Sequence, residues 1–175
     1  MRIPSGTYAF GPENAGLKLL TVKRSAVALS GHELTIAVQK WHATLRIDGD
    51  AGEMALTADS HSFHVLEGAG GTTALTDDDK ARIERAINDD VLKGCAIEFR
   101  STEVMLRGDA LNVHGELDLA GERQEIMFEL AVSVDGRLTG SACVARHTWG
   151  IKAFSAIFGP LPVGDEVHVV FEAAM

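Results

Sequence analysis

The chain has 175 residues, 46% of them hydrophobic and 23% charged, which suits a single domain spanning residues 1–175 with a core of its own. Its formal net charge of −9 excludes a general binder of nucleic acid or of anionic membrane surfaces, because both need a basic face. No apolar run approaches the roughly 18 residues of a membrane span, so we expect no integral membrane segment.

The first third of the chain gives three expectations. Residues 1–10 contain no apolar run of signal-peptide length, so we expect a cytoplasmic protein. Residues 34–38 alternate between large apolar side chains and polar or small ones, which is typical of a strand with one face inward. Residues 48–50, with the sequence Asp-Gly-Asp, mark a turn.

One segment has helical rather than strand periodicity. Thr76 is a good N-cap, and the three aspartates after it suit the positive end of a helix. Apolar residues then recur at helical spacing from Ile83 to Val91, and Gly94 suits the position after the last turn. The sequence therefore predicts one helix, a candidate lid or plug, joined to the preceding strand by the glycine-rich stretch 68–73.

Period-two alternation dominates the second half of the chain. Asp-Gly at positions 135–136 lies between two alternating runs and is a strong hairpin signal. The inward residues of the run 97–101 lie at odd-numbered positions, and those of the run 104–106 lie at even-numbered positions. This change of parity predicts a β-bulge near Thr102 or Glu103. With further alternating runs at 111–119, 126–134, 138–144 and 167–171, we expect about eight antiparallel strands, the number found in a small closed barrel.

The inward faces of these strands mix small residues with bulky ones. Ser101, Gly115, Gly140 and Ala142 share their faces with leucine, valine and phenylalanine. Such a lining would leave a narrow apolar cavity, which fits a lipid chain better than a polar metabolite. In the alternative interpretation, the small residues only match the taper of the barrel.

The sequence lacks the common motifs of catalysis and cofactor binding, namely a nucleophile elbow, a P-loop and a dinucleotide fingerprint. We therefore expect neither an enzyme nor a bound cofactor. His61 and His64 lie three apart on an expected strand and would point to opposite faces, and His168 occupies an outward position, so we expect no metal site. We expect Cys95 and Cys143 to be reduced thiols packed as small hydrophobic residues.

Four segments, in their order and spacing, resemble the YceI-like family of lipocalin-like proteins that bind polyisoprenoid or similar amphiphilic lipids. They are Ile97-Glu98-Phe99-Arg100-Ser101-Thr102, the run from Leu111 to Gly121, Arg146-His147-Thr148-Trp149-Gly150-Ile151, and Asp165-Glu166-Val167-His168-Val169. Weaker similarity covers Gly31 to Ile36 and Leu75 to Asp79. The chain departs from the family's pattern at Asn14-Ala15, Cys95 and Arg123-Gln124-Glu125. We expect these departures to change the contacts with the lipid head group more than the fold.

The resemblance implies an all-β, lipocalin-like antiparallel barrel with one helical excursion and a long apolar tunnel for the lipid chain. We expect ten residues to form its wall or mouth: Phe99, Leu117, Phe128, Leu130, Arg146, Trp149, Phe154, Phe158, Val169 and Phe171. Each could equally serve as barrel core. The fork-shaped, permanently charged Arg146 would hold a phosphate or a ring oxygen, or else pair with an acid on a neighbouring strand.

We therefore expect a non-catalytic protein that binds, sequesters or transports an isoprenoid, a quinone-like lipid or a fatty-acid-type ligand. One alternative is an interaction domain that forms a homodimer through an exposed sheet face or through the region from Trp149 to Phe158. The other is a small enzyme acting on a hydrophobic substrate, in which Arg146 or a histidine polarises an oxygen.

Overall fold

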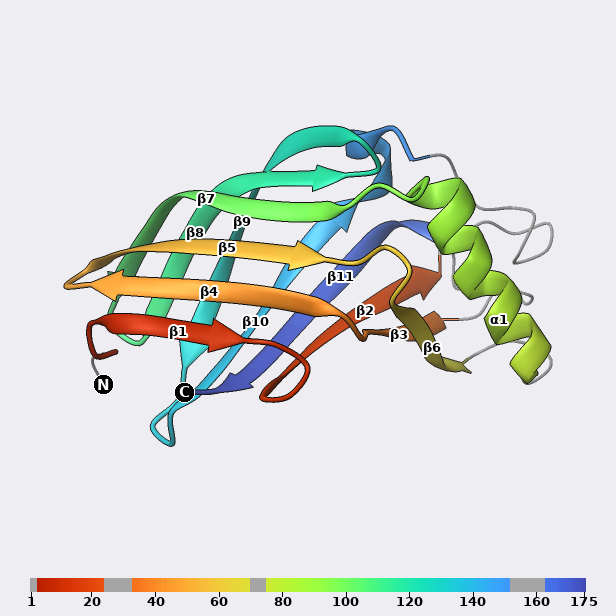
Figure 1. Ribbon diagram of the computed structural model, residues 1–175. Helices are drawn as coiled ribbons and strands as arrows, with labels where there is room; N and C mark the ends of the chain where they lie inside the picture. Colours follow the sequence, from red (N-terminus) through yellow and green to blue (C-terminus); the bar gives the residue numbers. More distant parts are fainter. Residues whose placement is uncertain (1–2, 24–32, 70–74, 152–162) are drawn as a thin grey trace.

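The computed structural model describes residues 3–23, 33–69, 75–151 and 163–175, and these form one antiparallel sheet that curls round its own inner face (Figure 1). Its eleven strands are hydrogen-bonded in the order β1-β4-β5-β7-β8-β9-β10-β11-β2-β3-β6. The strands are β1 (Gly6–Phe10), β2 (Ala15–Lys23), β3 (Glu33–Val38), β4 (Trp41–Asp48), β5 (Ala51–Ala58), β6 (Phe63–Ala69), β7 (Ile97–Arg107), β8 (Ala110–Leu119), β9 (Glu122–Val132), β10 (Arg137–Ala145) and β11 (Val163–Ala174). This architecture confirms the predicted all-β fold.

Alternation along each strand decides which face of the sheet is buried. In β4, the four residues Trp41, Ala43, Leu45 and Ile47 are buried, and the residues between them are not. Because successive side chains of a strand point to opposite faces, each strand contributes its apolar set to the same side. The hydrophobic core therefore lies on the inside of the curl.

The predicted number of about eight strands is wrong, because three extended runs are each broken into two strands. The breaks lie at residues 11–14, 39–40 and 59–62. Main-chain hydrogen bonds still join the second and third runs there, from Gln39 N–H to the Ser62 carbonyl (2.8 Å) and from Asp59 N–H to the Lys40 carbonyl (3.0 Å). At these corners the chain passes from one end of the strand order to the other, which holds the sheet in its curl.

The predicted helix is confirmed. α1 (Asp77–Ala86) begins at Thr76, whose hydroxyl accepts from the Asp79 N–H while the Asp79 carboxylate accepts from the Thr76 N–H, a complete capping box. The last turn differs from the expectation, because it is a π-helical turn, η1 (Ile87–Val91). Among the described residues, no helix is long and apolar enough to cross a membrane.

Two local predictions for the second half are also confirmed. The register between β7 and β8 shifts between Ser101 and Glu103, where opposite parity predicted a bulge. Gly136 adopts φ of +79° in the tight turn between β9 and β10, a conformation that glycine reaches without steric cost.

Candidate functional site

A partly open cavity of about 240 Å³ lies inside the curled sheet, and the surface that the lining residues expose to it is apolar throughout. The last strands show how the sequence builds this surface, since alternate residues along part of each strand face the space, with Ser141 of β10 as an addition to this pattern. These residues are Ile126, Phe128 and Leu130 of β9, Gly140, Ala142 and Val144 of β10, and Val167, Val169 and Phe171 of β11. The period-two pattern therefore places the apolar set of each strand in one wall.

Seven of the ten predicted site residues line this cavity. They are Phe99, Leu117, Phe128, Leu130, Arg146, Val169 and Phe171. Their contact with a ligand remains a prediction. Trp149 is buried next to the wall, and its indole N–H donates to the Leu117 carbonyl at 3.0 Å. Phe154 and Phe158 lie outside the described residues.

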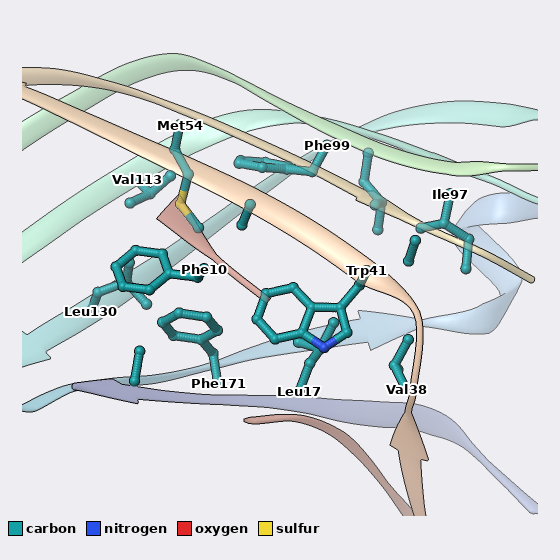
Figure 2. Close-up of a cluster of buried hydrophobic side chains, with 14 of the residues drawn as sticks. Phe10, Leu17, Val38, Trp41, Met54, Ile97, Phe99, Val113, Leu130 and Phe171 are labelled. Carbon is teal, nitrogen blue, oxygen red and sulfur yellow. The ribbon is translucent and has the colours of Figure 1, made fainter. Parts of the chain in front are cut away.

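Phe171 belongs both to the cavity wall and to an aromatic cluster that continues the core (Figure 2). The rings of Phe10 and Trp41 meet Phe171 edge-on, with centroids 5.5 and 5.9 Å away. This arrangement suits the quadrupoles of the rings and leaves little room between them. The cavity therefore ends against packed aromatic side chains on this side.

The small inward residues create less of the cavity than the sequence suggested. A Cβ atom on Gly115 would lie 2.6 Å from the Phe99 ring, and one on Gly140 would lie 2.5 Å from the Leu130 side chain. Both glycines therefore admit a neighbouring side chain. Ser101 accepts the Met54 N–H at 2.8 Å, where β5 and β7 are irregularly paired. Of the four, only Gly140 and Ala142 are among the described residues that border the cavity.

Sequence reasoning missed the part of the wall that comes from the first half of the chain. That part includes Leu17, Leu19, Leu34, Ile36, Val38, Met54, Leu56 and Phe63. The alternation of residues 34–38 was visible in the sequence. It gave no sign, however, of which other strands share the same interior.

The helical segment closes part of the cavity, as its prediction as a lid or plug implied. Ile87, Val91 and Leu92 line the space from η1 and the residue after it. Upstream in α1, the Glu84 carboxylate accepts the Val65 N–H at 2.9 Å and lies 3.0 Å from His64 Nδ1. α1 therefore occupies the free edge of β6, at one end of the curled sheet (Figure 1).

Arg146 follows β10 and begins the short 3₁₀-helix η2 (Arg146–Trp149). It is partly buried and borders the cavity, where the exposed surface is apolar. An arginine can present its aliphatic stem to an apolar space while its guanidinium lies beyond it.

A Ser–His–Asp cluster at the corner between β5 and β6 does not have the geometry of a catalytic triad. His61 Nδ1 lies 3.3 Å from both the Ser60 hydroxyl and the Asp59 carboxylate. A triad needs the two opposite nitrogens of the ring, one for each partner. The hydrogen bond from the His61 backbone N–H holds the pKa of Asp59 below its ordinary value. This carboxylate therefore stabilises the turn between β5 and β6.

A second cluster joins Cys143 of β10 to Glu166 and His168 of β11, with one potential metal-ligating atom of each within 4.8 Å of the others. The expectation that both cysteines pack as small hydrophobic residues is wrong for Cys143, which is exposed, whereas Cys95 is half-buried. The cluster became visible only with the pairing of β10 and β11.

Comparison with known proteins agrees with this architecture. A family model described as the YceI-like domain matches residues 19–175. BcnA of Burkholderia cenocepacia has a similar structure, with a TM-score of 0.65, 19% identity, and coverage of 90% of this chain and 94% of that one. A mutant CJ YceI protein with a monobromobimane guest has a TM-score of 0.54 and 13% identity, with coverage of 79% and 81%. Among curated proteins there is no match.

Proposed function

The chain belongs to the YceI-like family, and we propose that it is a non-catalytic protein that holds the chain of an amphiphilic lipid in the cavity of the curled sheet. The observation that carries this proposal is the apolar surface of the cavity. A polar metabolite placed there would lose its hydrogen bonds to water and gain none, at a cost of several kcal/mol. A hydrocarbon chain would instead gain about 0.8 kcal/mol for each CH₂ group that it buries.

The size of the cavity limits the part of the lipid that it can hold. A dry protein cavity of about 150 Å³ accommodates benzene, so about 240 Å³ has room for roughly ten carbons. An isoprenoid, quinone-like or fatty-acid-type ligand would therefore insert one narrow segment of chain. A longer chain would extend beyond the described cavity, past η1 or along the Arg146 stem.

The head group of this ligand would bind at Arg146. A carboxylate or a phosphate matches the fork of the guanidinium, which can donate two parallel hydrogen bonds. Because the cavity surface is apolar, the charge of the head group would stay outside the space that holds the chain. The cytoplasmic location and the homodimer remain predictions from the sequence.

Organic extraction of the purified full-length chain, followed by mass spectrometry, tests the proposal. We expect a prenyl or acyl lipid in near-equimolar amount, or, if the protein is purified empty, stoichiometric binding of added decanoate or of a short prenyl alcohol. An extract without lipid, together with no binding of either added ligand, would show that the cavity is not a lipid site.

A further inference from the structure

The outer face of β10 and β11 brings together a thiol, an imidazole and a carboxylate. Cys143 and His168 are direct partners in the antiparallel register, and Glu166 lies two residues before His168 on the same strand. Val144, Val167 and Val169, the residues next to them in sequence, line the cavity. Cys143, Glu166 and His168 therefore point away from the cavity, on the opposite side of the sheet.

The donor atoms of these three residues converge on one point. One atom of each, the Cys143 Sγ, a Glu166 carboxylate oxygen and a ring nitrogen of His168, lies within 4.8 Å of both others. Cys143 and Glu166 are exposed, and His168 is half-buried. The cluster is thus open to ions in solution, while the paired strands fix the Cα atoms that carry it.

This convergence differs from the geometry of a cysteine protease-like triad. In a triad the histidine stands between the nucleophile and the acid and bonds each through a different nitrogen, which separates sulfur from carboxylate by roughly 7 Å. Here the sulfur and the carboxylate oxygen are themselves within 4.8 Å. Three donors that are mutually close can share one cation instead.

We propose that Cys143, Glu166 and His168 form a binding site for a divalent transition-metal ion of the Zn²⁺ type. Zinc accepts thiolate, imidazole and carboxylate ligands and commonly takes three from the protein and a fourth from water. Tetrahedral coordination at about 2.0–2.3 Å places ligand atoms roughly 3.3–3.7 Å apart. The exposed Cys143 and Glu166 side chains would close this difference by small rotations, with no movement of the sheet.

The mixed donor set also indicates which ions would bind poorly. Calcium and magnesium take oxygen ligands, so a site with one carboxylate, one thiolate and one imidazole would discriminate against both. The site does not depend on the lipid cavity. It would bind metal whether or not the cavity holds a ligand, because its side chains lie on the other face of the sheet.

Titration of the full chain, free of any histidine tag, with Co²⁺ tests the site. We expect one equivalent to give a thiolate-to-cobalt charge-transfer absorption and intense visible bands typical of four-coordinate cobalt, and we expect Zn²⁺ to displace them. Cys143→Ser should abolish the charge-transfer absorption. His168→Gln and Cys143→Ser should each weaken Zn²⁺ binding at least about tenfold, since even the loss of an outer-shell partner costs 10–100-fold. Glu166→Gln should weaken binding and leave the thiolate absorption in place.

Two matched substitutions serve as controls. Cys95→Ser removes the other thiol, and His114→Gln removes another outward histidine on a strand, so both should leave the cobalt spectrum and the zinc affinity unchanged. Urea unfolding of each variant should match that of the unmodified chain, because the altered side chains are not core residues. The absence of a thiolate absorption in the unmodified chain, its persistence in Cys143→Ser, or an unchanged zinc affinity in any of the three ligand variants would overturn the proposal.

Discussion

At the scale of single residues, the glycines on the inner face show how little a small side chain says about empty space. We expected Gly115 and Gly140 to leave empty volume in the cavity. Instead, the space beside Gly115 is occupied by Phe99, and the space beside Gly140 is occupied by Leu130. The sequence revealed that the inner surface alternates small and large residues. Which large residue fills which gap depends on cross-strand register, and register is not a local property of the chain.

Gly115→Ala should destabilise the protein by about 1–3 kcal/mol, the range for overpacking a full core. The new Cβ would lie 2.4 Å from the Arg100 carbonyl oxygen, which is main chain and cannot rotate away. Gly6→Ala is the control, since nothing lies within 4 Å of a Cβ at that position in β1. Urea unfolding followed by circular dichroism gives both values, and equal midpoints would contradict the close packing described here.

Arg146→Leu should separate the contributions of head group and chain. If the guanidinium binds a carboxylate, losing a charge-assisted hydrogen bond worth about 1.5–3 kcal/mol weakens decanoate binding by roughly 10–100-fold. Binding of decanol, which has the same chain and no charge, should change much less. Calorimetry of both ligands with both proteins measures the difference, and an equal loss for acid and alcohol would argue that Arg146 only shapes the wall.

At the scale of elements, the sequence predicted those features that depend on neighbouring residues. The capping threonine and the helical spacing sufficed for α1, and the change of parity sufficed for the bulge in β7. The breaks at residues 11–14, 39–40 and 59–62 were not predicted, and missing these three breaks made the strand count too low. The Cys143, Glu166 and His168 cluster escaped for a related reason, because a cross-strand site exists only once β10 and β11 are paired.

The attachment of α1 to β6 gives a prediction at this scale. Glu84→Ala leaves the Val65 N–H without its carboxylate partner and removes the carboxylate oxygen that lies 3.0 Å from His64 Nδ1. We expect a loss of stability of about 1–3 kcal/mol, the cost of a hydrogen-bonding group left unsatisfied, and faster hydrogen exchange in α1 and β6. Arg85→Ala, an exposed neighbour on the same helix, is the control. Unchanged exchange in Glu84→Ala would show that the contact does not hold the helix in place.

At the scale of the whole molecule, the all-β class and most of the predicted wall residues could be predicted from period-two alternation. Alternating apolar residues indicate strands, and they also show which side chains of each strand point inward. The resemblance carried by residues 97–169 supplied the barrel architecture and the kind of ligand. Neither could supply the size of the cavity, which depends on how eleven strands and η1 pack together.

Ala142→Phe should fill the cavity from its wall. Ala142 of β10 borders the space, so a phenyl ring there would occupy volume that a lipid chain needs. We expect loss of decanoate binding with little loss of stability. Thr139→Phe places the same ring on the opposite face of β10 and should bind normally. If Ala142→Phe binds decanoate as the unmodified chain does, the ligand lies elsewhere.

The dependence of affinity on chain length tests the central claim most directly. Calorimetric titration with straight-chain carboxylates from six to eighteen carbons should show each added CH₂ gaining about 0.8 kcal/mol, a fourfold change in Kd, until roughly ten carbons fill the cavity, and then a plateau. The heat-capacity change should be negative and grow over the same range. An affinity that does not change with chain length, or no binding at any length, would contradict a lipid-holding cavity.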